Sequence, residues 1–276
     1  TTPATRMKGL LQMIKLVISD IDGTLVDETE QLSESAFALA RLLNEKGILF
    51  SLATGRVMEL SHSYAEKLSI HIPYVTANGA ALVKDGVTVS RESFALRPLT
   101  AAIHRADQLG LTIIYSPDGY ERIHRSTPYV FRQQAAFDRY HHIQPLTTFD
   151  LNNLFIEKIC FMDDDRTGAV QELEAMLRTQ TLPNRITAYG KRALEIAPAG
   201  VTKASGVGKL AALLGLGMDE VLTIGDDEND LEMLRHAAFS ATVSNALPKV
   251  KAQVGYVANA ACAAGVLEAV QYYLKD

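Results

Sequence analysis

The stretch Lys15-Leu16-Val17-Ile18-Ser19-Asp20-Ile21-Asp22-Gly23-Thr24-Leu25 decides the fold. An apolar, β-branched run with the length of a buried strand ends there at two aspartates and a glycine. Because residues i and i+2 of an extended segment project the same way, we expect Asp20 and Asp22 to point together. Two such carboxylates repel each other unless a cation compensates them, and the hard ion Mg²⁺ suits oxygen ligands. The stretch therefore predicts an active site at the end of a strand.

The Asp-x-Asp-Gly pattern is also found in two other structures, the calcium-binding loop and the hairpin turn. A calcium-binding loop that began at Asp20 would need an acidic or amide ligand at its fifth position and glutamate at its twelfth. Those positions hold Thr24 and Gln31, so the calcium interpretation fails. Asp22-Gly23 is also typical of a hairpin turn. Residues 33–46 read as a helix rather than as a partner strand, which disfavours the hairpin.

Composition and charge limit the class of protein. The chain has 276 residues, enough for one or two domains, and its 47% hydrophobic and 21% charged residues are typical of a globular protein. The 27 basic and 32 acidic residues give a net charge of −5, which argues against a nucleic-acid surface. No apolar run approaches the roughly 18 residues of a membrane span. We expect neither a nucleic-acid nor a membrane partner.

The cysteines and the first residues indicate the compartment. Cys160 and Cys262 are the two cysteines, and they read as ordinary thiols in a reducing compartment rather than as a disulfide framework. Residues 1–12 lack the apolar region of a secretory signal, so we expect a leader or a disordered end there. The expected location is the cytoplasm.

The order of elements predicts an α/β protein. Between residues 13 and 82, strands alternate with helices, which is the signature of a parallel sheet with right-handed crossovers. The same rhythm resumes in 197–276. Residues 83–196 instead combine helices with antiparallel strands. We therefore predict a doubly wound parallel sheet, a Rossmann-like core, from 13–82 and 197–276, with an α+β cap domain inserted at 83–196.

Polar turns follow three of the core strands. They are Asp20 with Asp22, Thr54-Gly55-Arg56 and Gly225-Asp226-Asp227. The carboxyl ends of parallel strands form the ligand crevice of an open sheet, so these turns are expected to converge. Thr54 offers a hydroxyl group, and Gly55 lets the backbone approach an anion at the next helix start.

Two further residues extend this predicted site. Lys203, near another helix start, suits a phosphate as a point charge, although a lysine in that position is usually solvated. Asp230 lies four residues after Asp226 and shares its face if the helix begins early. Acidic residues at a helix start also occur for the helix dipole alone, and that alternative stays open here.

Other polar groups have simpler interpretations. The glycines at 206–208 fit a dinucleotide fingerprint only within a helix, which is the wrong context. Asp163-Asp164-Asp165 reads as a solvated turn, and His141-His142 as surface. His124 and Arg125 end a strand of the cap, and a role in substrate binding is the less favoured alternative for them.

The ordered motifs resemble those of a known family. Asp20-Ile21-Asp22-Gly23-Thr24-Leu25, Thr54-Gly55-Arg56, Lys203 and Gly225-Asp226-Asp227-Glu228-Asn229-Asp230 are similar to the four motifs of the haloacid dehalogenase-like superfamily. The inserted domain resembles the class IIB cap of the Cof-type sugar phosphatases, and the resemblance covers the chain from Ile14 onward. The run 240–246 departs from the family, whose members usually carry more glycine and methionine there.

The resemblance implies a site and a mechanism. Asp20 would be the nucleophile that forms an aspartyl-phosphate, and Asp22 the general acid and base. A magnesium ion would be held by Asp20, the backbone carbonyl of Asp22 and Asp226, with Asp230 in support directly or through water. The residues expected to bind the phosphoryl group are Thr54, Gly55, Lys203 and Asn229.

The expected function is that of a Mg²⁺-dependent phosphomonoesterase acting on a small phosphorylated metabolite, with a sugar phosphate favoured. The cap would close over the substrate and select it. Two rivals remain: a phosphohexomutase, which moves a phosphoryl group between sugar hydroxyls, and a metabolite-binding regulator without turnover.

Overall fold

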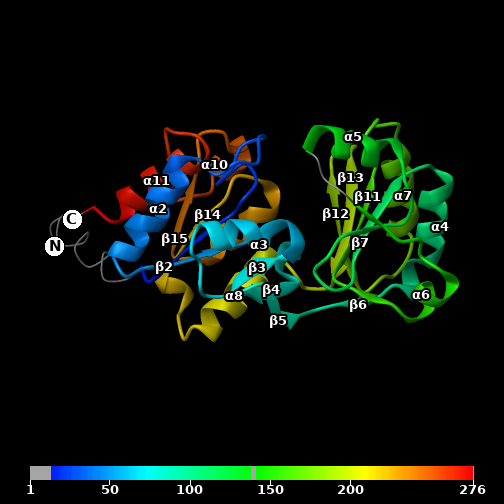
Figure 1. Cartoon of the computed structure of the whole chain (residues 1–276), viewed down its shortest axis with the longest axis horizontal. Helices are drawn as coiled ribbons and strands as arrows, with labels where there is room; N and C mark the ends of the chain where they lie inside the picture. The colour runs from blue at the N-terminus through cyan, green and yellow to red at the C-terminus, as the bar shows by residue number, and fades with distance from the viewer. Residues whose placement is uncertain (1–13, 138–140, 276) are drawn as a thin grey trace. The chain divides into compact units, whose positions relative to one another are not determined.

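The computed structural model describes residues 14–137 and 141–275 (Figure 1). The predicted leader, residues 1–12, lies outside the described part. The chain divides into two compact units. The first, here called the catalytic unit, runs up to Ser90 and resumes at Thr202, and the second, the inserted unit, is Arg91–Val201.

A five-stranded parallel sheet forms the centre of the catalytic unit. Its order is β16-β15-β14-β1-β2, and each neighbouring pair is parallel. The strands are β1 (Leu16–Ser19), β2 (Leu49–Leu52), β14 (Val221–Ile224), β15 (Phe239–Thr242) and β16 (Tyr256–Val257). This order requires crossovers on both sides of β1, as the sequence predicts for a doubly wound sheet.

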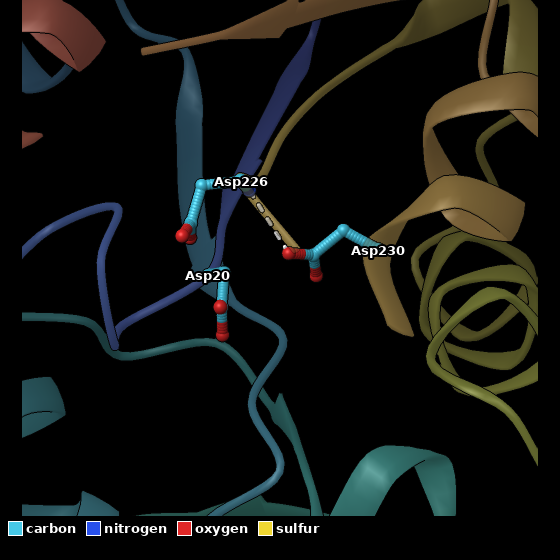
Figure 2. A group of neighbouring side chains, drawn as sticks. All are labelled: Asp20, Asp226 and Asp230. Carbon is cyan, nitrogen blue, oxygen red and sulfur yellow. Dashed lines mark hydrogen bonds between the residues drawn. The ribbon is translucent and has the colours of Figure 1, made fainter. Parts of the chain in front are cut away.

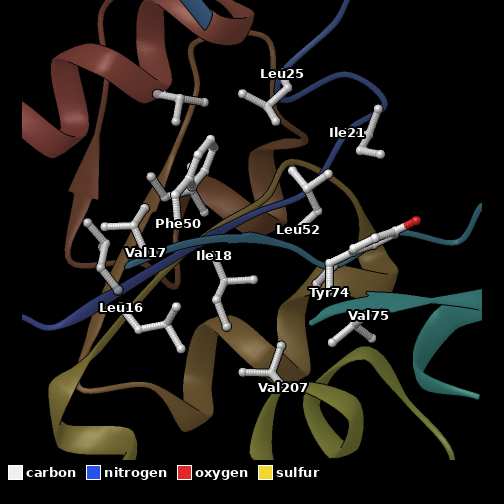
Figure 3. Close-up of a cluster of buried hydrophobic side chains, with 14 of the residues drawn as sticks. Leu16, Val17, Ile18, Ile21, Leu25, Phe50, Leu52, Tyr74, Val75 and Val207 are labelled. Carbon is white, nitrogen blue, oxygen red and sulfur yellow. The ribbon is translucent and has the colours of Figure 1, made fainter. Parts of the chain in front are cut away.

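Strand β1 is buried along its whole length because it lies between β14 and β2. Alternate residues of a strand face opposite sides of the sheet, and Val17 and Ile18 point into apolar side chains above and below it (Figure 3). The core therefore covers both faces, which explains why the strand reads as a continuous apolar run.

Helices enclose this sheet on both sides. α2 (Glu34–Glu45) packs beside α11 (Cys262–Tyr273), and α8 (Lys203–Leu213) packs beside α9 (Leu231–His236). Val207 of α8 lies on the same side of the sheet as Ile18 (Figure 3). Among the described residues, the unit also contains the α-helix α3 (Met58–Lys67) and the single turn α10 (Pro248–Lys251).

A small second sheet belongs to the catalytic unit. It contains β3 (Tyr74–Thr76), β4 (Ala81–Lys84) and β5 (Val87–Arg91), and Ala53 forms a parallel bridge to Val75 beside the main sheet. Because β4 pairs with β3, the compact catalytic unit extends past 82, where the sequence suggests that the cap begins. The inserted unit likewise extends past 196.

The inserted unit is built on a six-stranded sheet with the order β12-β13-β11-β7-β8-β9. The strands are β7 (Thr112–Ser116), β8 (Arg122–Ile123), β9 (His142–Ile143), β11 (Lys158–Met162), β12 (Asn184–Tyr189) and β13 (Ala193–Pro198). All of its pairs are antiparallel except β8 with β9. A separate pair joins β6 (Phe94–Ala95) to β10 (Phe155–Ile156).

Apolar packing fixes the helices of the inserted unit. α4 (Thr100–Gln108), α6 (Thr148–Asn153) and α7 (Ala169–Arg178) share one apolar cluster with the sheet. α5 (Pro128–Phe137) contributes Val130 to a separate cluster with Ile114 and Ile123. Among the described residues, none of the helices combines the length and apolar character that a bilayer crossing requires.

Candidate active site

Asp20 leaves the main sheet directly after β1. Its amide donates to the Ile224 carbonyl over 2.9 Å, so its backbone still pairs with the end of β14. Gly23 then turns the chain with a φ of 77°, a conformation that favours glycine. A Cβ atom at Gly23 would lie 2.3 Å from Oδ2 of Asp226. The two acidic loops therefore approach each other closely only because residue 23 is glycine.

The structure brings three carboxylates together at this edge of the sheet. Asp20, Asp226 and Asp230 each place one oxygen atom within 4.8 Å of the others (Figure 2). Asp20 follows β1, and Asp226 follows β14, the strand beside it. The convergence follows from the parallel pairing of these two strands, because parallel strands end at the same edge.

Lys203 is buried among these carboxylates rather than solvated. Its side chain is 1% exposed, and its Nζ lies 2.8 Å from Oδ1 of Asp20 and 2.7 Å from Oδ1 of Asp230. The capping box at the start of α8 explains this placement: the Ser205 amide donates to the Thr202 hydroxyl over 3.1 Å. Lys203 is thus the first residue of the helix.

Burial and nearby negative charge raise the pKa values of Asp20 and Asp226. Desolvation, followed by the Asp230 charge, raises the pKa of Asp20 well above its usual value despite the attraction of Lys203. Desolvation raises the pKa of Asp226 to about 6, against a hydrogen bond from Thr24 that lowers it. Burial lowers the pKa of Lys203, but Asp20 and Asp230 outweigh it and raise that pKa above its usual value. One ammonium therefore faces three carboxylates.

Asp230 organises the loop that carries Asp226. Its Oδ2 accepts the amides of Asp226 and Asp227 over 3.0 and 3.1 Å, and its Oδ1 contacts Lys203 (Figure 2). Gly225 allows this approach, since a Cβ there would lie 2.4 Å from Cγ of Asp230. Both oxygens of Asp230 are thus engaged within the protein.

Asp22 does not point together with Asp20, contrary to the expectation from its sequence position. Its side chain is 53% exposed and is bound by Arg56, with Nη2 2.5 Å from Oδ1 and Nε 2.9 Å from Oδ2. Strand β1 already ends at Ser19, so the alternation of an extended chain no longer applies at residues 20–22. The carboxylate of Asp22 lies outside the three-acid group.

Arg56 itself is held firmly. Its guanidinium is 11% exposed, lies 3.3 Å from Oε1 of Glu30 and stacks 5.2 Å from the ring centroid of Tyr64. The Thr-Gly-Arg motif marks Arg56 in the sequence, but its partner Asp22 lies 34 residues away, so the pairing has no local signal.

The predicted phosphate-binding residues lie in adjoining loops. Thr54 is buried, and its hydroxyl accepts the Arg56 amide over 3.1 Å. Gly55 lies against the side-chain amide of Asn78, because a Cβ at Gly55 would be 3.2 Å from it. Asn229 donates to Oδ1 of Asn78 over 3.1 Å. Asn78 thereby links the Thr54–Gly55 turn to the loop of Asp230.

Two contributors to the site were not assigned a role from the sequence. Asn78 has a left-handed backbone, with a φ of 54°, beside Gly79 with a φ of 102°. Thr24 donates its hydroxyl to Oδ1 of Asp226 over 2.5 Å. Thr24 stands within the first of the motifs quoted above, and the partners of both residues lie far away along the chain.

The remaining polar candidates have structural partners. The Asp163 carboxylate accepts the amides of Thr167, Gly168 and Ala169 at the start of α7. His124 accepts the Leu146 amide at Nδ1 over 2.9 Å, and Arg125 pairs with Asp107 at 2.5 Å. The glycines at 206–208 lie inside α8, as expected.

The donor set fits a hard divalent cation. Carboxylate oxygens are the ligands that Mg²⁺ prefers, and burial, together with the charge of Asp230, raises the pKa values of Asp20 and Asp226. A cation between Asp20 and Asp226 would favour the charged forms of both carboxylates. The arrangement suits chemistry in which charge builds up on an anionic substrate.

Comparison with known proteins identifies relatives along nearly the whole chain. The sequence profile of the haloacid dehalogenase-like hydrolases matches residues 17–270. A phosphoglycolate phosphatase from Aeropyrum pernix is 29% identical over 270 residues, 97% of either chain. An HMP-PP phosphatase from Klebsiella pneumoniae is 27% identical over 249 residues, 89% of either chain.

Solved structures share the fold. A protein from Thermotoga maritima superposes with a TM-score of 0.80 at 20% identity, covering 94% of this chain and 97% of its own. A HAD subclass IIB sugar phosphatase superposes with a TM-score of 0.78 at 21% identity, covering 94% of this chain and 98% of its own. These likenesses support an α/β fold with a parallel sheet.

Proposed function

This chain belongs to the haloacid dehalogenase-like hydrolases and is a phosphatase, and from that premise we propose that it hydrolyses a small phosphorylated metabolite of the sugar phosphate class, with Mg²⁺ and through a phosphorylated Asp20. The observation that carries the proposal is the buried Asp20 carboxylate, in contact with the Lys203 ammonium and grouped with Asp226 and Asp230. The predicted cytoplasmic location stays a prediction.

In the proposed first step, an oxygen of Asp20 attacks phosphorus, and the bond from phosphorus to the leaving alcohol oxygen breaks. Asp22 gives its proton to that oxygen. In the second step, water attacks phosphorus and gives a proton to Asp22, which releases inorganic phosphate and restores the Asp20 carboxylate. The half-exposed Asp22 is accessible for both transfers, and Arg56 fixes its orientation.

Charge compensation is the main task of the other residues. Lys203, the Thr54 hydroxyl, the Gly55 backbone and Asn229 would bind the phosphoryl oxygens. Mg²⁺ would be held by Asp20, Asp226 and the Asp22 carbonyl, and when bound it neutralises charge on the phosphoryl group. Asp230 would support that ion by holding the Asp226 loop, because its own oxygens bind Lys203 and two backbone amides.

The names of the relatives support a small substrate. They include phosphatases for phosphoglycolate and for HMP-PP, and one structural neighbour is a sugar phosphatase. We propose that the inserted unit selects the organic part of the substrate, as class IIB caps are expected to do. A panel of phosphorylated sugars, nucleotides and cofactors, ranked by kcat/KM, would identify the substrate.

The first experiment measures Mg²⁺-dependent release of p-nitrophenol from p-nitrophenyl phosphate. We expect Asp20→Asn to lower kcat by more than ~10³-fold, because loss of a nucleophile costs other enzymes up to ~10⁶-fold. Asp165→Asn is the matched control, since Asp165 is 69% exposed and pairs only at the surface with Arg132. Equal rates for Asp20→Asn and the intact protein would reject the mechanism.

A second readout separates the rivals. A phosphohexomutase would return labelled phosphate to another hydroxyl of the sugar, whereas a phosphatase releases it to water. A regulator without turnover would bind the sugar phosphate and release no phosphate.

A further inference from the structure

The end of β15 and the turn that follows it, residues 242–247, bind both acidic loops of the site. The Thr242 hydroxyl donates to the Gly225 carbonyl over 2.6 Å, and the Leu247 amide donates to the Asp226 carbonyl over 3.1 Å. Asn245 donates its Nδ2 to the Gly23 carbonyl over 2.7 Å. One short turn therefore restrains the backbone on either side of the three-acid group. It includes part of the run that departs from the usual family sequence.

Asn245 uses both ends of its side-chain amide. While Nδ2 donates to Gly23, Oδ1 accepts the amide of Cys262 over 3.0 Å. Cys262 is the first residue of α11. Asparagine can donate and accept in this way, whereas alanine can do neither. The side chain thus ties the Asp22–Gly23 loop to the start of a helix that packs in the core.

The hydrogen bond from Asn245 to the Gly23 carbonyl matters because a glycine backbone can adopt many conformations. The Gly23 carbonyl and the Thr24 amide belong to the same planar peptide group. A hydrogen bond that holds the carbonyl therefore also holds the backbone nitrogen of Thr24. The Thr24 hydroxyl in turn donates to Oδ1 of Asp226 over 2.5 Å. A continuous path of hydrogen bonds and one peptide plane therefore leads from Asn245 to the carboxylate of Asp226.

We propose that Asn245 is a positioning residue of the site, which orients Asp226 for a divalent cation through Gly23 and Thr24. The inference rests on the proposed metal-dependent function. Asn245 is itself exposed, and both of its partners are backbone groups that water can satisfy after a substitution. Its loss should therefore affect the orientation of the metal ligands far more than the fold.

The test measures binding of Mn²⁺ alone, in place of Mg²⁺, by electron paramagnetic resonance on the full chain without substrate. We expect Asn245→Ala to raise the Kd for Mn²⁺ about 10-fold, as substitutions behind metal ligands do elsewhere. Asn152→Ala is the matched control, because Asn152 also donates its Nδ2 to a backbone carbonyl, that of Thr148, in the inserted unit. Its Kd should equal that of the intact chain.

A double substitution tests the path itself. Thr24→Val removes the hydroxyl that reaches Asp226 at little change in shape. If Asn245 acts through Thr24, the pair Thr24→Val and Asn245→Ala should bind Mn²⁺ no more weakly than Thr24→Val alone. Fully additive losses would overturn the proposed path.

The outcomes separate this inference from the proposed function. An Mn²⁺ affinity unchanged by Asn245→Ala overturns the positioning role, even if the intact chain hydrolyses phosphomonoesters. A weakened affinity supports the role, even if no phosphomonoester is hydrolysed. In an active enzyme, the supporting result also includes a higher half-saturating Mg²⁺ concentration, with kcat within about 3-fold once Mg²⁺ saturates.

Discussion

Each unit of the molecule contains a buried lysine, and the two lysines have different surroundings. In the catalytic unit, Lys203 lies 2.8 and 2.7 Å from two carboxylates, with the third acid of the group, Asp226, nearby. In the inserted unit, Lys158 lies 3.7 Å from Oε2 of Glu195, on the neighbouring strand. Both side chains are removed from water, and Lys203 is the one that contacts a group of three acids.

The difference separates a binding site from a structural ion pair. Burial lowers the pKa of Lys158, but Glu195, with a smaller contribution from Glu121, outweighs burial and raises that pKa above its usual value. A buried pair of opposite charges needs no further ligand. Within the described residues, Asp20, Asp226 and Asp230 are the one group of three or more acidic, histidine or cysteine side chains close enough to share a cation. Excess charge, rather than burial, therefore marks the site.

The largest expected effects are changes in the free energy of unfolding, and they have opposite signs in the two units. Glu195→Leu leaves the Lys158 ammonium buried without this partner and should lower the free energy of unfolding by about 3–5 kcal/mol. Asp20→Asn removes one of the crowded acids and should raise the stability of the metal-free protein, since the pKa of Asp20 is raised by burial and by Asp230. Urea unfolding in EDTA measures both.

The matched control is the double variant Lys158→Met and Glu195→Leu, which should recover most of the stability lost by Glu195→Leu alone. A destabilised Asp20→Asn protein in EDTA would contradict the idea that the acids of the catalytic unit carry excess charge.

The effect of intermediate size is the stabilisation of the folded protein by bound Mg²⁺. Binding to the folded state should stabilise the intact chain by about 2.7 kcal/mol at a concentration of 100 times Kd. Asp226→Asn should abolish this gain, whereas Lys158→Met should retain it, because the inserted unit holds no share of the proposed ion. Thermal unfolding with and without Mg²⁺ measures the gain. An equal gain in all three proteins would place the ion elsewhere.

The smallest expected effect is a dependence of the folding stability on pH, caused by Asp226. The folded-state pKa of Asp226 is raised to about 6, above its value of about 4 in an unfolded chain. Its contribution to stability is therefore present below pH 4 and is lost as the pH rises through 6. In EDTA, the stability difference between the intact chain and Asp226→Asn should shift in favour of the variant over this window. Mg²⁺ affinity should increase over the same window. A difference that is constant from pH 4 to 7 would contradict the assignment.

The sequence predicts the parts of the site that depend on parallel strand ends. The runs before Asp20 and Asp226 read as buried strands, and neighbouring parallel strands bring their following residues together. The sequence predicts Lys203 near a helix start, and its role at the site follows from the family resemblance; in the structure, the Thr202 cap fixes that start. These features are local signals combined with one topological rule.

The sequence does not predict pairings between distant side chains. Nothing near Asp22 shows that Arg56 binds it, and nothing near Asn245 shows that it reaches Gly23. The boundaries of short elements also lack a local signal: residues 155–162 taken alone read as one strand. The structure ends β10 at Ile156 and begins β11 at Lys158, because the two strands pair with different partners, β6 and β7.

The divided catalytic unit has a consequence for biosynthesis. Asp20 leaves the ribosome early, but β14 and Lys203 are made only after the whole inserted unit. Until then, β1 lacks one of its two neighbours, and the Asp20 carboxylate has no ammonium to meet. The inserted unit is continuous in sequence, so every strand of its sheet is synthesised before the catalytic unit is complete. A newly made chain therefore acquires its charged centre as one of its last structural events.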